Sequence, residues 1–494
     1  MSREASSVTR RRRMSVLLLT ATLLAGCASA APTDTPLDSS PPSARSDADA
    51  AAPSPVGPAP VVLDVDMSAD DAMAIPFLVR EPSLDVRAVN VVGTGLVHCA
   101  QGIQFATDIL AALGRRDIPV SCGGEAPLGP GHEFPAEWRA RADAEYGLSM
   151  RRQPASIPDM TPTERLQAVA ADAGRPITVI ATGPMTNLAE AFAADPSLPS
   201  KIERIVAMAG AIDVPGNVDL GQGVLPAEWN VYADPTAWDE VLRSGVPITV
   251  IPLDATKDAP VNAAFLAELE QDHAAAPADI VYELLVRGAL SPAYGDQFWD
   301  PLAAVMTVDE PVGTIETIPL KVVTAEGRDS GRTIRADDGV PVRVATAANQ
   351  ARFEERLLQG LRLGAPRDPP FSVEGTMSVR FDGVTCADER PEPVVPGDWR
   401  IEAASTVQGT AAPVLVQFHE GYGWDDLVEY TKTSADPTAQ PPFVEVPWVS
   451  VFETPGTSVS IVTLAAGNYA FVCLAVEEPD PEPVLASGVF TVAP

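Results

Sequence analysis

The sequence is poor in positive charge and in histidine. Its 494 residues include 34 Lys and Arg against 67 Asp and Glu, which leaves a formal net charge of -33, and only 4 His. Such acidity argues against binding to nucleic acids or to anionic membrane surfaces, because both are negatively charged. After the N-terminal leader, no stretch reaches about eighteen uninterrupted apolar residues, so the sequence predicts no membrane-spanning helix there.

The N-terminus has the features of a bacterial lipoprotein leader. Residues 10–13 are all Arg, and residues 14–25 form an apolar segment too short to span a bilayer permanently. The segment runs into Leu24-Ala25-Gly26-Cys27, which resembles a lipobox, the motif whose cysteine is lipidated and becomes the mature N-terminus. We therefore expect residues 1–26 to be a signal peptide. The protein would be exported and anchored to the outer face of a bacterial cell membrane through a lipid on Cys27 alone.

Composition divides the rest of the chain into a tether and two domains. Residues 27–59 are dominated by Ala, Pro, Ser and Asp, so they cannot build a core and predict a disordered tether. The Gly- and Pro-rich stretch at 364–370 predicts a hinge. The domains would then occupy residues 60–364 and 371–494.

The two domains differ in their hydrophobic patterns. In the first, helical patterns alternate with short β-branched runs at 61–65, 86–92, 118–120, 177–180, 205–208 and 248–251. This alternation predicts an α/β fold with a mainly parallel sheet wrapped by helices, in which ligands bind at the carboxyl ends of the strands. In the second domain, strand-like runs at 414–418, 458–464 and 469–476 predict a small all-β sandwich.

Of the 5 cysteines, Cys27 is assigned to lipidation and the other four are available for disulfides in an exported protein. Cys386 with Cys473 is the preferred pair, because both lie in the second domain. A bond between Cys99 and Cys122 is the other option, although connectivity does not follow from sequence.

The most informative segment directly follows the first apolar run. Asp64-Val-Asp66-Met-Ser68-Ala-Asp70-Asp71 places four carboxylates within eight residues. Carboxylates this close raise one another's pKa unless a cation compensates, and their oxygens suit Ca²⁺ or Mg²⁺. A simpler interpretation is a helix start, with Ser68 as the N-cap and two acids in the first turn. That interpretation explains only two of the four acids.

The same segment resembles the Asp-x-Asp-x-x-x-Asp-Asp opening of the inosine-uridine type nucleoside hydrolases. Further blocks follow in the family's order at 177–188, 206–217, 227–230, 232–235 and 299–302. The resemblance covers the first domain but neither the leader nor the second domain. It implies hydrolysis of the N-glycosidic bond of ribonucleosides to ribose and free base, with a small-molecule nucleoside as the binding partner.

Carried over residue by residue, the resemblance implies a Ca²⁺ site formed by Asp66, Asp71, Asp300 and the backbone carbonyl of Thr182. Ca²⁺ commonly takes about six to eight oxygens, which leaves room for a water and two ribose hydroxyls. The ion would hold the sugar and lower the pKa of the water. Asp66 matches the family's general base, which takes a proton from that water as it attacks the anomeric carbon.

The resemblance also assigns residues to the sugar. Asp70 and Asn230 would bind the ribose hydroxyls, while Asn217 and Glu228 would face the rest of the sugar. Asn217 follows a glycine and could instead belong to a turn. A carboxylate-rich pocket would favour the positive charge that develops on the sugar as the glycosidic bond lengthens.

Two positions depart from the family pattern. Gly95 stands where many members have a ribose-contacting asparagine, and Trp299 stands where some have a histidine that protonates the departing base. An indole cannot usefully donate a proton, but Trp299 can stack on the base. The nearby histidines, His98 and His132, are candidate acids or ordinary surface residues. The long segment 123–148 is either a lid over the site or a surface excursion.

The second domain has a weak resemblance of its own. Residues 467–473 resemble the strand of cupredoxin-like domains that ends in a copper-ligating cysteine, here Cys473. A blue-copper centre also needs two histidines, and His419 is the only one after the hinge. The sequence therefore predicts a structural β-sandwich without copper ligands, for cell-wall or partner contact.

Three functions remain open on sequence alone. The first is Ca²⁺-dependent ribonucleoside hydrolysis. The second is a haloacid-dehalogenase-like phosphatase, in which Asp64 and Asp66 would be the aspartyl nucleophile pair. The third is a surface riboside-binding lipoprotein with weak or no catalysis, suggested by Gly95 and Trp299. The sequence determines neither base preference nor oligomeric state.

Overall fold

The computed structural model describes residues 57–154, 160–221, 223–433, 440–452, 454–476, 483–484 and 488–493. Cys27, the leader and nearly all of the predicted tether lie outside these residues, so the lipid anchor, the signal peptide and the disordered tether remain predictions. No helix within the described ranges is long and apolar enough to cross a membrane.

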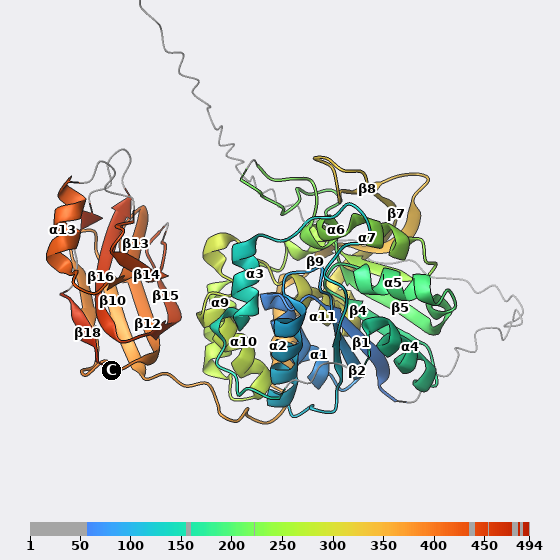
Figure 1. Ribbon diagram of the computed structural model, residues 1–494, viewed down its shortest axis with the longest axis horizontal. Coiled ribbons are helices and arrows are strands. Elements are labelled where there is room, and N and C mark those ends of the chain that lie inside the picture. The colour runs from blue at the N-terminus through green and yellow to red at the C-terminus, as the bar shows by residue number, and fades with distance from the viewer. Residues whose placement is uncertain are drawn as a thin grey trace, which may run out of the picture. The chain divides into compact units, whose positions relative to one another are not determined.

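A nine-stranded sheet organises the first part of the chain (Figure 1). Its strands are β1 (Ala59–Val65), β2 (Leu84–Val91), β3 (Val120–Cys122), β4 (Ile177–Ala181), β5 (Ile202–Met208), β6 (Ile248–Ile251), β7 (Gly313–Val322), β8 (Thr333–Arg335) and β9 (Val340–Ala348). They are arranged in the order β3-β2-β1-β4-β5-β6-β9-β7-β8. The pairs from β3 to β9 are parallel, and β7 pairs antiparallel with both β9 and β8.

The sheet confirms the predicted α/β architecture. Each of the six predicted β-branched runs of the first domain overlaps one of the strands β1 to β6. The antiparallel extension formed by β7, β8 and β9 was not predicted. In strand β7 only Ile318 and Leu320 are buried and the other positions are exposed or half-buried, so it lacks the continuous apolar run of a strand covered on both faces.

Helices cover both faces of this sheet. They are α1 (Ala69–Arg80), α2 (Cys99–Ala112), α3 (Ala136–Asp143), α4 (Pro162–Asp172), α5 (Thr186–Ala194), α6 (Trp229–Ala233), α7 (Pro235–Leu242), α8 (Leu253–Thr256), α9 (Ala263–Gln271), α10 (Ala276–Val286), α11 (Trp299–Val308) and α12 (Gln350–Leu361). Along β1, Val61 and Leu63 pack into one core cluster and Val62 into another. Side chains alternate along a strand, so β1 contributes to both cores.

The C-terminal part is all-β apart from one helix, which confirms the predicted sandwich. Its strands are β10 (Gly375–Phe381), β11 (Cys386–Glu389), β12 (Gly397–Ser405), β13 (Thr410–Phe418), β14 (Val444–Val449), β15 (Gly456–Leu464), β16 (Gly467–Val476), β17 (Pro483–Val484) and β18 (Phe490–Val492), and the helix is α13 (Trp424–Thr433). One sheet has the order β11-β10-β12-β15 and the other β14-β13-β16-β17, with β18 also paired to β16. Trp399 from the first sheet and Phe471 from the second share one buried core. Helix α13 was not predicted.

Both disulfides considered from the sequence are present. Cys386 of β11 bonds to Cys473 of β16, so this bond joins the two sheets of the sandwich. Cys99, the first residue of α2, bonds to Cys122, the last residue of β3. Because Cys473 is in a disulfide, its sulfur is not a free thiolate for copper.

The segment predicted as a hinge is tied to the first domain by contacts that include one buried side chain. Arg367 is only 4% exposed and forms ion pairs with Asp279 and Glu283 of α10. Removing one partner of a buried pair leaves an uncompensated charge, so this contact is costly to break. The predicted domain limits at 364 and 371 remain predictions.

Candidate active site

The site lies where the sheet changes direction of winding. Strands β2 and β3 lie on one side of β1 and β4 lies on the other, so the chain crosses over from β3 to β4 and the strand order reverses at β1. Crevices at such switch points, outside the carboxyl ends of the strands, are where open α/β sheets bind ligands. Asp66 follows β1, Gly95 follows β2 and Thr182 follows β4, so three predicted site positions meet at this edge.

A tight turn after β1 presents the first carboxylates. Met67 is buried and has a left-handed backbone (φ 57°), and the next residue, Ser68, begins α1 as its N-cap. The Asp71 carboxylate accepts hydrogen bonds from the backbone N–H of Asp66 (2.9 Å) and of Ser68 (3.3 Å). The helix-start interpretation is therefore confirmed for Ser68. It describes only part of what these acids do.

Asp300, more than 200 positions away in the sequence, joins the same cluster. It lies in the first turn of α11, and its backbone N–H donates to Asp70 Oδ2 at 3.3 Å. The Ser68 hydroxyl lies 2.7 Å from Asp70 Oδ1 and 3.2 Å from Asp300 Oδ2. The four carboxylates of Asp66, Asp70, Asp71 and Asp300 thus gather at one place, and each residue is at most 7% exposed.

The electrostatics of this cluster are unfavourable without a positive partner. Burial raises the pKa of Asp66, and the charges of Asp71 and Asp70 raise it further. Burial likewise raises the pKa of Asp300 and, together with the charge of Asp70, raises the pKa of Asp71 to about 6. No Lys or Arg of the described residues forms an ion pair with any of the four. The cluster therefore needs a cation to remain fully ionised near neutral pH.

We tested whether these residues fit the Ca²⁺ that the resemblance implies. No three acidic, histidine or cysteine side chains in the described part of the chain are already arranged around a metal position. The carboxylates instead accept local hydrogen bonds, such as the one from Leu96 N–H to Asp66 Oδ2 at 3.2 Å. The donor chemistry nevertheless fits, since the cluster consists of buried carboxylate oxygens without a basic partner, as a hard dication requires.

Thr182 and Asn230 lie together at the edge of this cluster. The Thr182 hydroxyl donates to Asp71 Oδ1, and its backbone carbonyl accepts a hydrogen bond from Asn230 Nδ2 at 2.9 Å. Asn230 Nδ2 also donates to the carbonyl of Met208, at the end of β5, at 3.0 Å. Since both amide protons can be used in these two bonds, Asn230 Oδ1 remains available as an acceptor.

Glu228 and Asn217 hold backbone groups in place. Glu228 is the N-cap of α6, where Oε1 accepts from Asn230 N–H (2.8 Å) and Oε2 accepts from Gly210 N–H (3.0 Å). Burial raises the pKa of Glu228 to about 7. Asn217 Oδ1 accepts from the backbone N–H of Trp229 at 3.1 Å. Both residues thus position the segment that carries Asn230, and their contact with the sugar remains a prediction.

Asp64 stands behind the cluster. It is 1% exposed, and Asn187 Nδ2 donates to its Oδ2 at 3.2 Å and to the carbonyl of Val91 at 3.1 Å. A carboxylate enclosed in this way cannot approach a phosphate ester as a nucleophile. This location speaks against the phosphatase interpretation, which needs Asp64 as part of a reacting pair.

In the structure, Gly95 lies so close to Asp66 that a side chain would not fit there. A Cβ atom at this position would lie 2.2 Å from Asp66 Cβ and 2.7 Å from Asp66 Oδ2. Gly183, which the sequence analysis missed, faces Asp66 from the β4 side, where a Cβ would lie 2.9 Å from Asp66 Cβ. Glycine is therefore required on both sides of Asp66. In the sequence, the Gly residues next to Thr94 and Thr182 were the feature that could have indicated this close packing.

The four histidines of the chain are engaged with other partners. His98 Nδ1 lies 2.7 Å from Asp143 Oδ2, and the His132 ring stacks on Tyr232 with centroids 3.7 Å apart. His273 pairs with Asp279 of α10, and His419 lies near Glu445 of β14. Trp299 opens α11 beside Asp300 and is partly buried against the core, where its ring remains a predicted stacking surface.

The segment predicted as a possible lid packs on the helix that carries Asn230. Phe134 stacks on Trp229 with centroids 4.8 Å apart, and Trp138 meets the same indole edge-on at 5.4 Å. These aromatic contacts hold segment 123–148 against α6. Whether the segment opens and closes remains a prediction.

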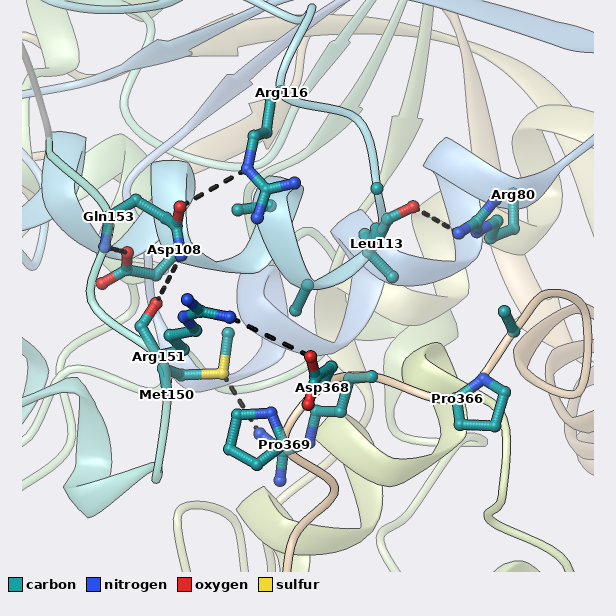
Figure 2. Close-up of a pocket in the computed structure, with 15 residues that line it drawn as sticks. Arg80, Asp108, Leu113, Arg116, Met150, Arg151, Gln153, Pro366, Asp368 and Pro369 are labelled. Atoms are coloured by element: carbon teal, nitrogen blue, oxygen red, sulfur yellow. Dashed lines mark hydrogen bonds and ion pairs between the residues drawn. The ribbon is translucent and has the colours of Figure 1, made fainter.

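A separate hollow, shown in Figure 2, is lined by residues that include Arg80, Arg116, Arg151 and Asp368. Arg80 is the last residue of α1, whereas the acidic cluster includes the first turn of the same helix. A helix of 12 residues is roughly 18 Å long, so the hollow is remote from the carboxylates. It contains none of the predicted site residues.

Comparison with known proteins then identifies the family. The model of the inosine-uridine preferring nucleoside hydrolase family matches residues 61–355, which include the whole acidic cluster. The chain belongs to that family. The resemblance drawn from the sequence is thereby confirmed, and membership in a nucleoside hydrolase family disfavours the phosphatase interpretation a second time.

Individual members of the nucleoside hydrolase family match only in part. The pyrimidine-specific ribonucleoside hydrolase RihA of Escherichia coli O139:H28 is 33% identical over 204 residues, which are 41% of this chain and 63% of RihA. The RihA of Photobacterium profundum is 33% identical over 203 residues with the same coverage. The chain therefore spans less than two thirds of the length of these relatives.

Solved structures of nucleoside hydrolases match over nearly their whole length. A plant nucleoside hydrolase, PpNRh1, is 28% identical with a TM-score of 0.55, and the match covers 62% of this chain and 99% of that one. The inosine-uridine preferring nucleoside hydrolase of Bacillus anthracis has a TM-score of 0.54 at 23% identity, with the same coverage, and supports the fold alone.

Proposed function

We propose that this protein hydrolyses the N-glycosidic bond of ribonucleosides to ribose and free base. The observation that carries the proposal is the gathering of Asp66, Asp70 and Asp71 with the distant Asp300 at the carboxyl edge of a parallel sheet. Such a carboxylate-rich pocket suits a sugar that becomes positively charged as its bond to the base lengthens. Membership in the nucleoside hydrolase family supports the same reaction.

We infer that Ca²⁺ is held by Asp66, Asp71, Asp300 and the carbonyl of Thr182. The support is the donor chemistry, because these oxygens are buried and lack a basic partner in the described residues. When bound, Ca²⁺ would supply the positive centre that keeps the carboxylates ionised, binds ribose hydroxyls and lowers the pKa of a water. The side chains then carry out the proton transfer.

In this mechanism the side chains around the ion bind the sugar, orient one another or accept a proton. Asp66 accepts a proton from the attacking water, and the neighbouring Leu96 N–H, which donates to Asp66 Oδ2, keeps the carboxylate oriented. Asp70 accepts a hydrogen bond from a ribose hydroxyl, with the Ser68 hydroxyl fixing its other oxygen. Asn230 Oδ1 accepts a second sugar hydroxyl while its amide group is held by two carbonyls. Trp299 would stack on the base.

Removal of divalent cations should abolish hydrolysis. With the chelator EGTA, we expect base release from uridine to fall to background, because the buried carboxylates then partly protonate and lose their hold on the sugar. Addition of excess Ca²⁺ should restore the rate. Uridine and inosine should both be assayed by the ultraviolet change on base release. Full activity in EGTA after dialysis would contradict the Ca²⁺ assignment.

We also propose that the protein is exported and lipid-anchored through Cys27. The support is the sequence of residues 10–27, in which Arg, an apolar segment and a lipobox-like motif follow one another. Without the lipid, Cys27→Ser should either appear in the soluble fraction or accumulate as the uncleaved precursor. Immunoblotting of the membrane and soluble fractions shows both results. An unchanged, detergent-requiring membrane association of a fully processed variant would refute the anchor.

A further inference from the structure

Residues 92–98, the loop between β2 and α2, hold Asp66 from one side. Leu96 N–H donates to Asp66 Oδ2 at 3.2 Å, and Val97 N–H donates to the backbone carbonyl of Asp66 at 3.3 Å. From the other side, Ser68 N–H donates to Asp66 Oδ1 at 3.2 Å. The orientation of the Asp66 carboxylate therefore depends on where the loop 92–98 lies.

This loop ends in a helix start that does not cap itself. His98 is the N-cap of α2, and its side chain makes no capping hydrogen bond. The first N–H groups of a helix have no partner within the helix, and carboxylates near them also interact favourably with the helix dipole. Two carboxylates of segment 123–148 accept these protons. Glu125 Oε1 accepts from Cys99 N–H at 2.9 Å, and Asp143 Oδ1 accepts from the N–H of the N-cap residue at 3.0 Å.

Asp143 contacts His98 through both its main chain and its ring. While Oδ1 of the carboxylate accepts the His98 N–H, Oδ2 lies 2.7 Å from His98 Nδ1. An ionised carboxylate only accepts hydrogen bonds, so Nδ1 carries the proton of this contact. Two hydrogen bonds between the same two residues fix the position and the direction of the end of the loop.

Asp143 is itself held against α2 by a neighbouring residue. It is the last residue of α3, and Glu145, which follows shortly after, is 3% exposed and forms an ion pair with Arg152. Arg152 also contacts Asp108 of α2, which is 1% exposed, at 3.2 Å. The end of α3 is thus attached to α2 at two places. Moving it away from His98 would disturb the contacts of two buried carboxylates, which is costly.

We propose that Asp143 is a positioning residue for Asp66. Through His98 it fixes the loop whose N–H groups orient the carboxylate that takes the proton of the attacking water. The assignment rests on the hydrolase function proposed above, and it gives Asp143 no contact with the substrate. It also gives segment 123–148 a part in catalysis that requires no opening or closing.

The test compares Asp143→Leu and Asp143→Asn with wild type at saturating Ca²⁺, on whichever of uridine and inosine wild type hydrolyses faster. Leucine has the branching of aspartate but accepts no hydrogen bond. We expect Asp143→Leu to lower kcat about tenfold, since a displacement of about 1 Å at a reacting group can cost about 10²-fold and the contact with Ser68 N–H limits the shift. KM should stay within about threefold, because Asp143 does not touch the substrate.

Asp143→Asn tests whether the hydrogen bonds carry the effect. Asparagine keeps an acceptor for His98 N–H and offers its own N–H to the unprotonated form of Nδ1. It should therefore keep kcat within about threefold of wild type. The matched control is Glu137→Leu, which removes an exposed carboxylate from the first turn of the same helix α3 and should leave kcat unchanged.

A second comparison separates positioning of the base from a loss of folded protein. In the Asp66→Asn background no base is left to position, so adding Asp143→Leu should lower the remaining rate by less than about twofold, as measured with proportionally more enzyme. A folding defect would lower the rate by the same factor in both backgrounds.

The assignment is supported by a loss of kcat in Asp143→Leu that Asp143→Asn avoids and that disappears in the Asp66→Asn background. Wild-type kcat in Asp143→Leu, a change confined to KM, an equal loss in Asp143→Asn, or an equal loss in both backgrounds would overturn it and leave the hydrolase function intact. A wild-type protein inactive on both nucleosides would overturn the proposed function and the assignment together.

Discussion

Asp66→Asn is expected to lower kcat for nucleoside hydrolysis by about 10²- to 10⁴-fold, the usual contribution of a general base. The amide has nearly the shape of the carboxylate and can still accept the hydrogen bond from Leu96 N–H. It cannot take a proton from water, and it removes one negative charge from the four-carboxylate cluster. Initial rates of base release at saturating uridine and Ca²⁺ measure the effect.

The control for this prediction is an aspartate outside the site. Asp172→Asn changes a side chain that is 85% exposed and should leave kcat within about twofold of wild type. Thermal denaturation of both variants should show intact folding, because Asp66→Asn relieves repulsion among buried charges rather than removing a favourable pair. If Asp66→Asn kept wild-type kcat, Asp66 would not be the base.

Gly95→Ala should cost about 10²-fold or more in kcat although it adds one methyl group and no charge. The added Cβ would lie 2.2 Å from Asp66 Cβ, well inside van der Waals contact, so Asp66 or the turn after β2 must shift. A displacement of about 1 Å at a reacting group is enough for a loss of this size. The rate is measured as for Asp66→Asn.

Gly423→Ala is the matched control, because a Cβ at Gly423 meets nothing within 4 Å. It should keep wild-type activity and nearly wild-type stability. Wild-type activity in Gly95→Ala would mean that the close approach of Gly95 to Asp66 has no catalytic importance. Gly95 would then be the lost sugar contact that the sequence alone suggested.

Much of the fold follows from the sequence because strands β1 to β6 are covered by helices. Such strands read as short β-branched runs, and their order along the chain with intervening helical patterns indicates a parallel sheet. Strands β7 to β9 were not predicted, because exposed and half-buried positions interrupt their apolar residues. Helix α13 interrupts a domain whose other elements all read as strands.

The candidate site was predictable where its residues are neighbours in sequence. Asp66, Asp70 and Asp71 stand in one motif, and the family resemblance added Thr182 and Asp300. Contacts that form only in the folded protein could not be predicted from the sequence. The sequence could show neither that Glu228 is used as a helix cap nor that Gly95 and Gly183 enclose Asp66.

The central claim is tested most directly by incubating the purified protein with uridine and with inosine in phosphate-free buffer containing Ca²⁺, and measuring free base and reducing sugar together. The account predicts equal amounts of base and ribose from at least one of the two nucleosides. Binding of nucleoside in a calorimeter without any release of base would contradict it and leave a riboside-binding lipoprotein in its place.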